Sequence, residues 1–202
     1  MLFALFAADF TDYQLGHFYD TWEVTEQALR PVADAVVRFA SGTGVLVGPD
    51  LLATNHHVRE AVGTHTVVVH GAEVRRVELL ASDPEHDVAL YRVHGEALPH
   101  VTLREAPVAV GEAVAVVGYP ATPEVKTSFG AVLADALVIN GVDSIEYSAQ
   151  TWWGSSGSAV VDTEGRLVAL HWGWDADGES HGRLLGVPTQ HIASLIQTTQ
   201  NP

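Results

Sequence analysis

The chain has 202 residues, of which 47% are hydrophobic and 17% charged, with 25 acidic residues against 10 Lys and Arg. The apolar fraction excludes an intrinsically disordered chain, and the formal charge of −15 argues against a nucleic-acid partner, because phosphate contacts need clustered basic residues. The absence of cysteine from the sequence excludes a disulfide scaffold, a thiol nucleophile and a thiolate metal site.

The first nine residues are mostly apolar. A secretory signal peptide would need Lys or Arg before such a run, and none precedes it. No stretch of the sequence reaches the roughly 18–20 apolar residues that a membrane-spanning helix needs. The missing signal and the missing cysteines predict a cytoplasmic protein without a membrane partner.

Residues 1–35 are predicted to form a helical appendage to one main domain, residues 36–202. Within the appendage, residues 20–30 indicate a helix, because Asp20 or Thr21 can cap its start and Pro31 is expected to end it. This segment is expected either to pack on the main domain or to be the docking surface for a partner protein.

Beyond Pro31, short Val-rich runs alternate with Gly, Pro, Asp and Asn, a pattern that predicts a dozen closely spaced strands. Asn140-Gly141 is the strongest dipeptide signal for a tight hairpin. Helices do not alternate with these strands, so we expect an all-β antiparallel barrel or sandwich and one C-terminal helix at 192–197. The predicted strands are 36–40, 44–47, 51–54, 66–70, 74–80, 88–93, 114–118, 130–139, 144–149, 158–161, 167–172 and 183–187.

Three short segments of the chain place a histidine, an aspartate and a serine, in this order, next to predicted strands. A serine hydroxyl becomes a good nucleophile only when an imidazole takes its proton, and a carboxylate fixes the tautomer of that imidazole. We therefore predict His57 as the general base, Asp87 as the group that orients it and Ser156 as the nucleophile. The segments are Thr54–Val58, His86–Leu90 and Gly154–Ser158.

The glycines around Ser156 permit a tight turn that aims backbone N–H groups at one point. Gly154 and Ser156 are predicted to donate these groups to an oxyanion hole, where each donor is worth roughly 10²–10³ in rate. Subtilisin-like enzymes run Asp, His, Ser and α/β-hydrolases run Ser, Asp, His, whereas chymotrypsin-type enzymes run His, Asp, Ser. The order found here favours the last class.

With these motifs, and with Gly42–Gly44 and Gly118–Pro120, the sequence from about Val36 to about Ile192 resembles the trypsin-like (chymotrypsin-fold) serine proteases of bacteria. The nearest motifs are those of the high-temperature-requirement proteases and the glutamyl endopeptidases. The resemblance implies two antiparallel six-stranded β-barrels, near 36–100 and 105–190, with the active site in the cleft between them. It also implies a serine endopeptidase that acts on proteins or peptides and needs no cofactor.

The family places its catalytic histidine directly before a small apolar residue, which favours His57 over the neighbouring His56. The two histidines are expected to lie on one strand, so that their side chains point to opposite faces. Asp83 is a weaker candidate than Asp87, because no strand run follows it directly.

The resemblance also implies a specificity pocket and a strand that binds the substrate backbone. Glutamyl endopeptidases have a hydroxyl residue and a His-Trp-Gly run at the positions of Thr151 and His171, which implies a preference for Glu before the cut bond. Trp174 stands where a small residue is usual and is expected to narrow the pocket. Alternatively, His171 is a polar core residue. The predicted substrate-binding residues are Thr151, His171, Trp172, Gly173 and Trp174.

Two other functions remain open. One alternative to the endopeptidase is a pseudoprotease that binds peptides without cutting them. The other is a regulated effector domain that joins a larger assembly through residues 1–35. The acidic loop at 175–180 is expected to be a solvated hairpin tip, because the twelve-residue frame of a Ca²⁺ loop is missing. No metal site is predicted, since the histidines are too dispersed for a zinc set: His65, His70, His94 and His100.

Overall fold

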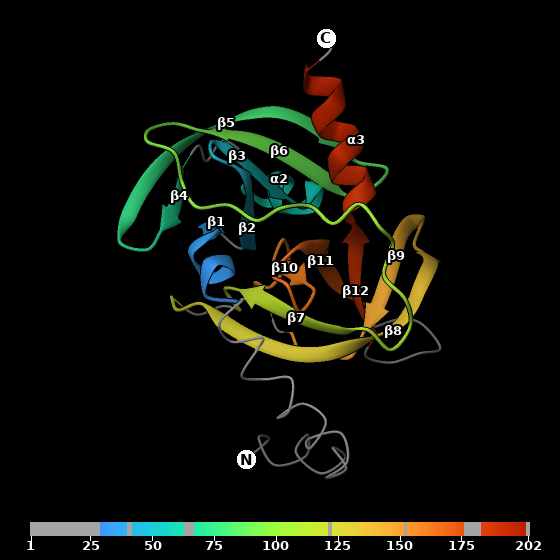
Figure 1. Cartoon of the computed structure of the whole chain (residues 1–202). Coiled ribbons are helices and arrows are strands. Elements are labelled where there is room, and N and C mark those ends of the chain that lie inside the picture. Colours follow the sequence, from blue (N-terminus) through green and yellow to red (C-terminus); the bar gives the residue numbers. More distant parts are fainter. Residues whose placement is uncertain are drawn as a thin grey trace.

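The structure, a computed structural model, describes residues 29–39, 42–62, 67–120, 123–151, 153–175 and 183–200. Within these residues the chain forms two closed antiparallel barrels of six strands each, as predicted (Figure 1). Most of the helix predicted at 20–30 lies outside the described residues.

The first barrel has the strand order β1-β2-β3-β6-β5-β4. Strand β6 is buried at five of six positions, because helices α2 and α3 pack against it in addition to the barrel interior. A run of valine and leucine suits such a strand, which has little contact with water on either face. The strands are β1 Val36–Phe39, β2 Gly42–Gly48, β3 Leu51–Thr54, β4 Val67–His70, β5 Glu73–Asp83 and β6 Val88–Val93.

The second barrel has the order β10-β11-β12-β9-β8-β7. The hairpin between β8 and β9 turns at Asn140 and Gly141, which both have positive φ angles, as a two-residue hairpin turn requires. The strands are β7 Ala113–Gly118, β8 Lys126–Ile139, β9 Val142–Tyr147, β10 Ala159–Val161, β11 Leu167–Asp175 and β12 Arg183–Pro188.

One apolar cluster extends through both barrels. It contains buried residues of the first barrel, such as Phe39 and Leu90, together with residues of the second, such as Val161 and Leu170. A second, smaller cluster around Tyr147 fills the remaining interior of the second barrel. The two barrels therefore share a continuous hydrophobic contact.

The helices differ from the sequence predictions in three respects. Residues 29–34 are helical, so the helix continues past Pro31, and α3 runs over Thr189–Gln200 instead of 192–197. Helix α2, His56–Val62, was not predicted at all, because seven residues give too little periodicity to distinguish a helix from a strand end. None of the described helices combines the length and apolar character needed to cross a bilayer.

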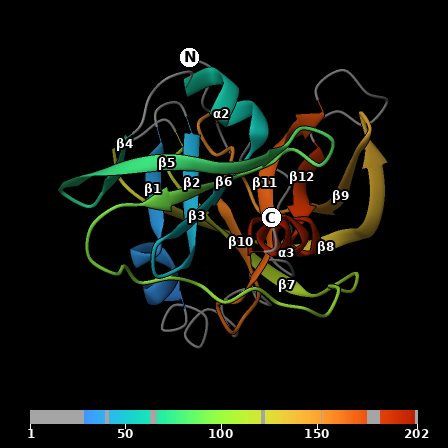
Figure 2. The same cartoon turned by 90° about the horizontal axis from the view of Figure 1, so that it is seen from above.

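Two segments connect the barrels. The chain between β6 and β7 first bonds to the first barrel, where Val101 N donates to Leu46 O, and then to the second, where Arg104 N donates to Leu167 O. Helix α3 follows β12 of the second barrel but packs against β5 and β6 of the first. Figure 2 shows α3 end-on, with β5 and β6 on one side of it and β8 and β9 on the other.

Candidate active site

His57 and Asp87 form a close pair through two hydrogen bonds. His57 Nδ1 lies 2.8 Å from Asp87 Oδ2, and the backbone N–H of His57 donates to Asp87 Oδ1 at 2.9 Å. The aspartate is only 8% exposed, whereas the side chain of His57 is 44% exposed. The buried carboxylate therefore fixes one edge of the imidazole, and the ring remains open to solvent.

The backbone of Asp87 is held in an unusual conformation in the turn between β5 and β6. Its φ angle of 54° lies in the left-handed region, which non-glycine residues adopt infrequently and which costs of order 1–3 kcal/mol. Asn55 is fully buried, and its side-chain amide donates to the carbonyl of Asp87 at 3.2 Å. Asn55 thus positions the aspartate that contacts His57, a role that the sequence analysis missed.

The two alternative candidates have other partners. His56 lies beside His57 on helix α2, not on a strand, so the expectation of opposite faces was wrong; successive helical residues are about 100° apart. The Nδ1 of His56 lies 2.6 Å from the hydroxyl of Ser82. The carboxylate of Asp83 lies 2.7 Å from Nδ1 of His86.

The loop that carries Ser156 is anchored to the first barrel by Thr43. The backbone N–H of Thr43 donates to Ser156 O at 2.8 Å, and its hydroxyl donates to Gly154 O at 3.2 Å. Gly157 has a φ of 83°, and a Cβ there would collide with the carbonyl oxygen of Thr43. Glycine is therefore required at this position for the serine loop to lie so close to strand β2.

Strand β2 also brings the serine loop near helix α2. A Cβ built on Gly42 would lie 2.9 Å from Ser156 O and 3.0 Å from the side chain of Val58, the residue after His57. The hydroxyl of Ser156 donates to Trp172 O at 3.4 Å and not to His57. In ligand-free enzymes, catalytic hydrogen bonds are often long and shorten when substrate binds.

His171 is buried and hydrogen-bonded. It is 3% exposed, and its Nδ1 lies 2.6 Å from the hydroxyl of Tyr147, which also donates to Leu185 O at 3.2 Å. Burial lowers the pKa of His171 to about 3, because the charged imidazolium loses its solvation there. The imidazole is therefore neutral at pH 7. Tyr147, its partner, was not predicted from the sequence.

This burial predicts a loss of stability in acid. As pH falls below about 6.5, the unfolded chain protonates His171 while the folded chain keeps it neutral, so the free energy of unfolding decreases by about 2 kcal/mol at pH 5. Urea unfolding at about pH 7.5 and pH 5 should show that H171N loses about 2 kcal/mol less than the wild type. Equal losses in the two proteins would contradict the buried, neutral histidine.

The other predicted pocket residues lie around strand β11. Strand β10 pairs with β11 only as far as Leu170. Beyond His171, β11 pairs with β12 alone, so its other side has no partner strand among the described residues. The position of a Cβ on Gly173 is open, with no atom within 4 Å, and the indole of Trp172 donates to the Ser144 hydroxyl at 3.0 Å. Within the described part of the chain, residues 172–174 thus present a free strand edge beside Ser156.

Thr151 does not share a described cavity with His171. It lines a hollow of about 280 Å³ together with Ser155 and Gly118, and His171 is not among the lining residues. The side chain of Trp174 lies outside the described atoms, although its backbone pairs with Leu184. The structure therefore brings His57 to Asp87 and Ser156 to the β11 edge, but it does not bring Thr151 and His171 into one described pocket.

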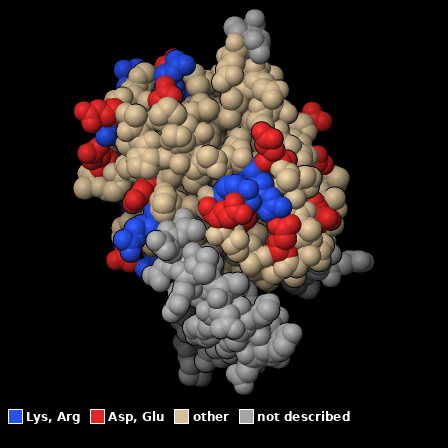
Figure 3. Space-filling model, viewed as in Figure 1, with Lys and Arg blue, Asp and Glu red and all other residues tan. Residues whose placement is uncertain are grey.

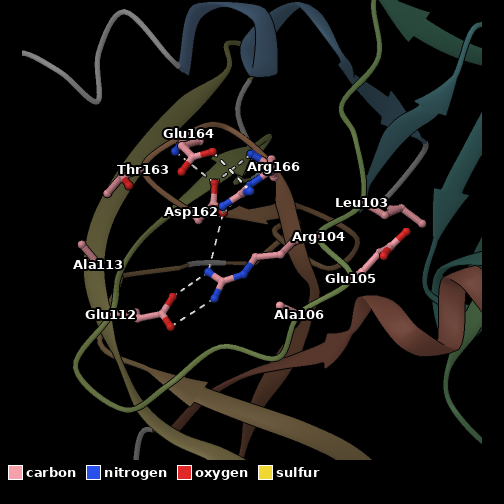
Figure 4. A pocket seen from close by; sticks show the side chains of 10 residues that line it. All are labelled: Leu103, Arg104, Glu105, Ala106, Glu112, Ala113, Asp162, Thr163, Glu164 and Arg166. Atoms are coloured by element: carbon pink, nitrogen blue, oxygen red, sulfur yellow. Dashed lines mark hydrogen bonds and ion pairs between the residues drawn. The ribbon is translucent and has the colours of Figure 1, made fainter.

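A larger cavity of about 620 Å³ contains no candidate catalytic residue (Figure 4). Arg104 from the connecting segment binds both carboxylate oxygens of Glu112, at 2.6 and 3.1 Å, and Arg166 lies 2.8 Å from Asp162. Arg104 also lies 3.6 Å from Asp162, so the cluster holds the connecting segment against the second barrel. On the face seen in Figure 3, Lys and Arg lie beside Asp and Glu.

Comparison with known proteins agrees with this architecture. A family model described as a trypsin-like peptidase domain matches residues 42–170. The probable periplasmic serine endoprotease DegP-like of Chlamydia trachomatis is 25% identical over 168 residues, covering 80% of this chain and 33% of that protein. The serine protease Rv3671c of Mycobacterium tuberculosis is 26% identical over 169 residues, covering 78% of this chain and 42% of that protein. The chain thus spans about a third of the length of the first of these relatives.

Solved structures share the fold. The HtrA-type protease AlgW with a bound tripeptide has a TM-score of 0.78 and 25% identity, covering 88% of this chain and 64% of that one. An inactive form of Rv3671c from M. tuberculosis, a Ser-to-Ala mutant, has a TM-score of 0.73 and 22% identity, covering 89% and 94% of the two chains. The second likeness concerns the fold alone.

The comparisons contradict the predicted cytoplasmic location. Three relatives from three species of Chlamydia are named as probable periplasmic endoproteases. The prediction rested on a missing signal peptide and missing cysteines. A lack of cysteine does not indicate the compartment, because proteins in oxidising compartments also fold without disulfides when their hydrophobic core is large enough.

Proposed function

Because the chain belongs to the trypsin-like peptidase family, we propose that it is a serine endopeptidase that cuts proteins or peptides through an acyl-enzyme. The observation that carries the proposal is the double hydrogen bond between His57 and Asp87. The hydroxyl of Ser156 attacks the substrate carbonyl, His57 takes its proton and returns it to the leaving amine, and Asp87 stabilises the imidazolium. The names of the relatives also favour a periplasmic or secreted location.

The N–H groups of Gly154 and Ser156 would stabilise the oxyanion that forms during this attack. The carbonyl of Ser155 accepts the N–H of Ser158 at 2.8 Å, so the peptide plane that also carries the Ser156 N–H is fixed before substrate arrives. Such pre-organisation supports the assignment, because fixed donors need no reorganisation during the reaction.

The substrate backbone would add as a strand to the free edge of β11 at residues 172–174. Main-chain hydrogen bonds to an exposed edge bind extended peptides without dependence on sequence. The contact between the Ser156 hydroxyl and Trp172 O supports this position, since it places the nucleophile at the same edge.

Labelling of the whole chain with a fluorophosphonate probe tests the proposal against a pseudoprotease that only binds peptides. The probe forms a covalent bond to an activated serine and to no other hydroxyl of ordinary reactivity. A chain that binds peptides but does not react with the probe would support the pseudoprotease. Residues 1–28 lie outside the described residues, so docking of a partner through residues 1–35 stays a prediction.

For the substrate preference we propose Glu before the cut bond, recognised by His171. A neutral imidazole can donate from Nε2 to a carboxylate only if its Nδ1 accepts a hydrogen bond. The hydroxyl of Tyr147 has one proton, which in this geometry goes to Leu185 O at 3.2 Å. Recognition of Glu requires that this proton turn to Nδ1 of His171, the nearer acceptor at 2.6 Å, when the carboxylate binds.

The preference is tested with peptides that differ only in having Glu, Gln, Asp, Ala or Phe before the cut bond. Replacing His171 by Asn should reduce kcat/KM for the Glu peptide by roughly 30–1000-fold, the equivalent of about 2–4 kcal/mol, and should affect the Ala peptide far less. If the wild type cuts Ala or Phe fastest, His171 is a structural residue and the proposed preference is wrong.

A further inference from the structure

A cluster of metal-ligating side chains lies where the two barrels and the C-terminal helix meet. His86 belongs to the turn between β5 and β6, Asp143 to β9 and His191 to α3. One ligand atom from each residue lies within 4.8 Å of the others. Nε2 of His191 is 3.2 Å from Asp143 Oδ2, and the rings of His86 and His191 stack with centroids 4.0 Å apart.

The imidazole of His86 is already oriented by a second carboxylate. Its Nδ1 lies 2.7 Å from Asp83 Oδ2, which leaves Nε2 as the nitrogen that can bind an ion. Histidines that bind metals usually have their other ring nitrogen fixed in this way, since the carboxylate sets the tautomer and makes the ligand more basic. Asp83 therefore supports the cluster without being one of its ligands.

We propose that His86, Asp143 and His191 bind a divalent transition-metal ion of the zinc class. Two imidazoles and one carboxylate are a donor set that suits Zn²⁺, and a three-residue set leaves a fourth position for water. Two ligands of a tetrahedral zinc, each about 2.0–2.1 Å from the ion, are about 3.3 Å apart. The observed 3.2 Å between His191 and Asp143 matches this separation.

Binding requires a small rearrangement of the two rings. The lone pair of an imidazole nitrogen lies in the plane of the ring, and the planes of His86 and His191 are within 17° of parallel. The rings must therefore tilt toward a common point between them. The side chains of His86 and Asp143 are 30% and 46% exposed and that of His191 only 11%, so the tilt falls mainly on His86.

Ordinary ion pairing explains the arrangement less well. As ion pairs, the His86–Asp83 and His191–Asp143 contacts would need both imidazoles to be charged; with neutral rings they are single hydrogen bonds, which leave the convergence of the three ligand atoms unexplained. Two imidazolium rings 4.0 Å apart repel one another, and partly exposed ion pairs contribute only about 0–1 kcal/mol. A metal ion uses both histidines in their neutral form, so stacking and ligation do not conflict.

The proposed ion would join parts of the chain that are far apart in sequence. It would link the turn of the first barrel that carries Asp87 to a strand of the second barrel and to α3. Because the ligands converge only in the folded chain, an ion bound there stabilises the native state by mass action.

The test uses the full, untagged chain, stripped with EDTA, dialysed and titrated with ZnCl₂ in a calorimeter. One ion per chain should bind at this cluster, and zinc in 100-fold excess over its dissociation constant should raise the melting temperature by roughly 5–10 °C. The variants H191A and D143N should each weaken zinc binding at least tenfold and abolish most of that shift.

H94A is the matched control, because His94 pairs with Glu78 at 3.5 Å on the exposed surface of the first barrel and is not a member of the cluster. It should bind zinc like the wild type. Zinc that binds only in the millimolar range would overturn the proposal. The proposal would also fail if H191A and D143N bound zinc as tightly as H94A does. Neither readout depends on proteolysis, so a failure here leaves the proposed function untouched.

Discussion

Replacing Ser156 by alanine is expected to reduce the turnover of peptide substrates by a factor of about 10⁶ and to abolish fluorophosphonate labelling. The variant removes only the oxygen that is proposed to attack the substrate carbonyl. Peptide binding should remain, because the main-chain contacts of that edge do not involve the hydroxyl.

The fold should tolerate this change. The hydroxyl of Ser156 makes one long hydrogen bond, 3.4 Å to Trp172 O, so its loss should alter the free energy of unfolding by less than about 1 kcal/mol. S148A is a matched control, since that hydroxyl accepts a bond from Ala131 N elsewhere in the second barrel. Activity in S156A close to that of S148A would show that Ser156 is not the nucleophile.

Replacing Asp87 by asparagine is expected to lower turnover by about 10⁴-fold while leaving a folded protein. Asp87 accepts two hydrogen bonds from His57, one from the backbone N–H and one at Nδ1. An amide has only one acceptor oxygen, so its NH₂ group must face one of these positions. The imidazole then loses either its anchoring bond or the tautomer in which Nε2 can take a proton.

D83N is the informative comparison for this prediction. The two aspartates are four residues apart, but the carboxylate of Asp83 contacts His86 and not His57. Turnover measured in the presence of EDTA should fall less than about tenfold in D83N, as expected for a group outside the reacting atoms. If D83N lost as much as D87N, the turn as a whole, and not the Asp87 carboxylate, would determine activity.

The strands were predictable because the sequence marks both the strands themselves and the turns between them. Val-rich runs supply buried residues for both faces, and Gly, Pro, Asn and Asp separate them, so all twelve strands were expected close to their observed positions. The closure of these strands into two barrels was implied by the family resemblance. The periodicity of the sequence did not predict it, because a local pattern does not show which strands pair.

Helix α2 was missed although one signal for it was present. Asn55 precedes His56, and asparagine is a favoured cap at a helix start, where its carbonyl accepts the bond from Arg59 N. The first-turn position of His57 matters for the site, because it lets the backbone N–H and the ring of the same residue reach one carboxylate.

Other parts of the site had no local signal. Tyr147 and His171 meet because β9 and β11 both pair with β12, and His86, Asp143 and His191 meet at a seam between three elements. Such contacts depend on strand order and helix packing, which spacing along one sequence does not encode. They become visible only when the strands are placed in space.

The apolar cluster that extends through both barrels makes them one cooperative unit. His57 and Asp87 belong to the first barrel and Ser156 to the second, so neither half holds the complete set of proposed catalytic groups. Since the same buried residues stabilise both halves, one barrel cannot lose its structure while the other keeps its full stability. If the proposed activity holds, partly unfolded molecules lack a working site and cannot digest neighbouring chains while they fold.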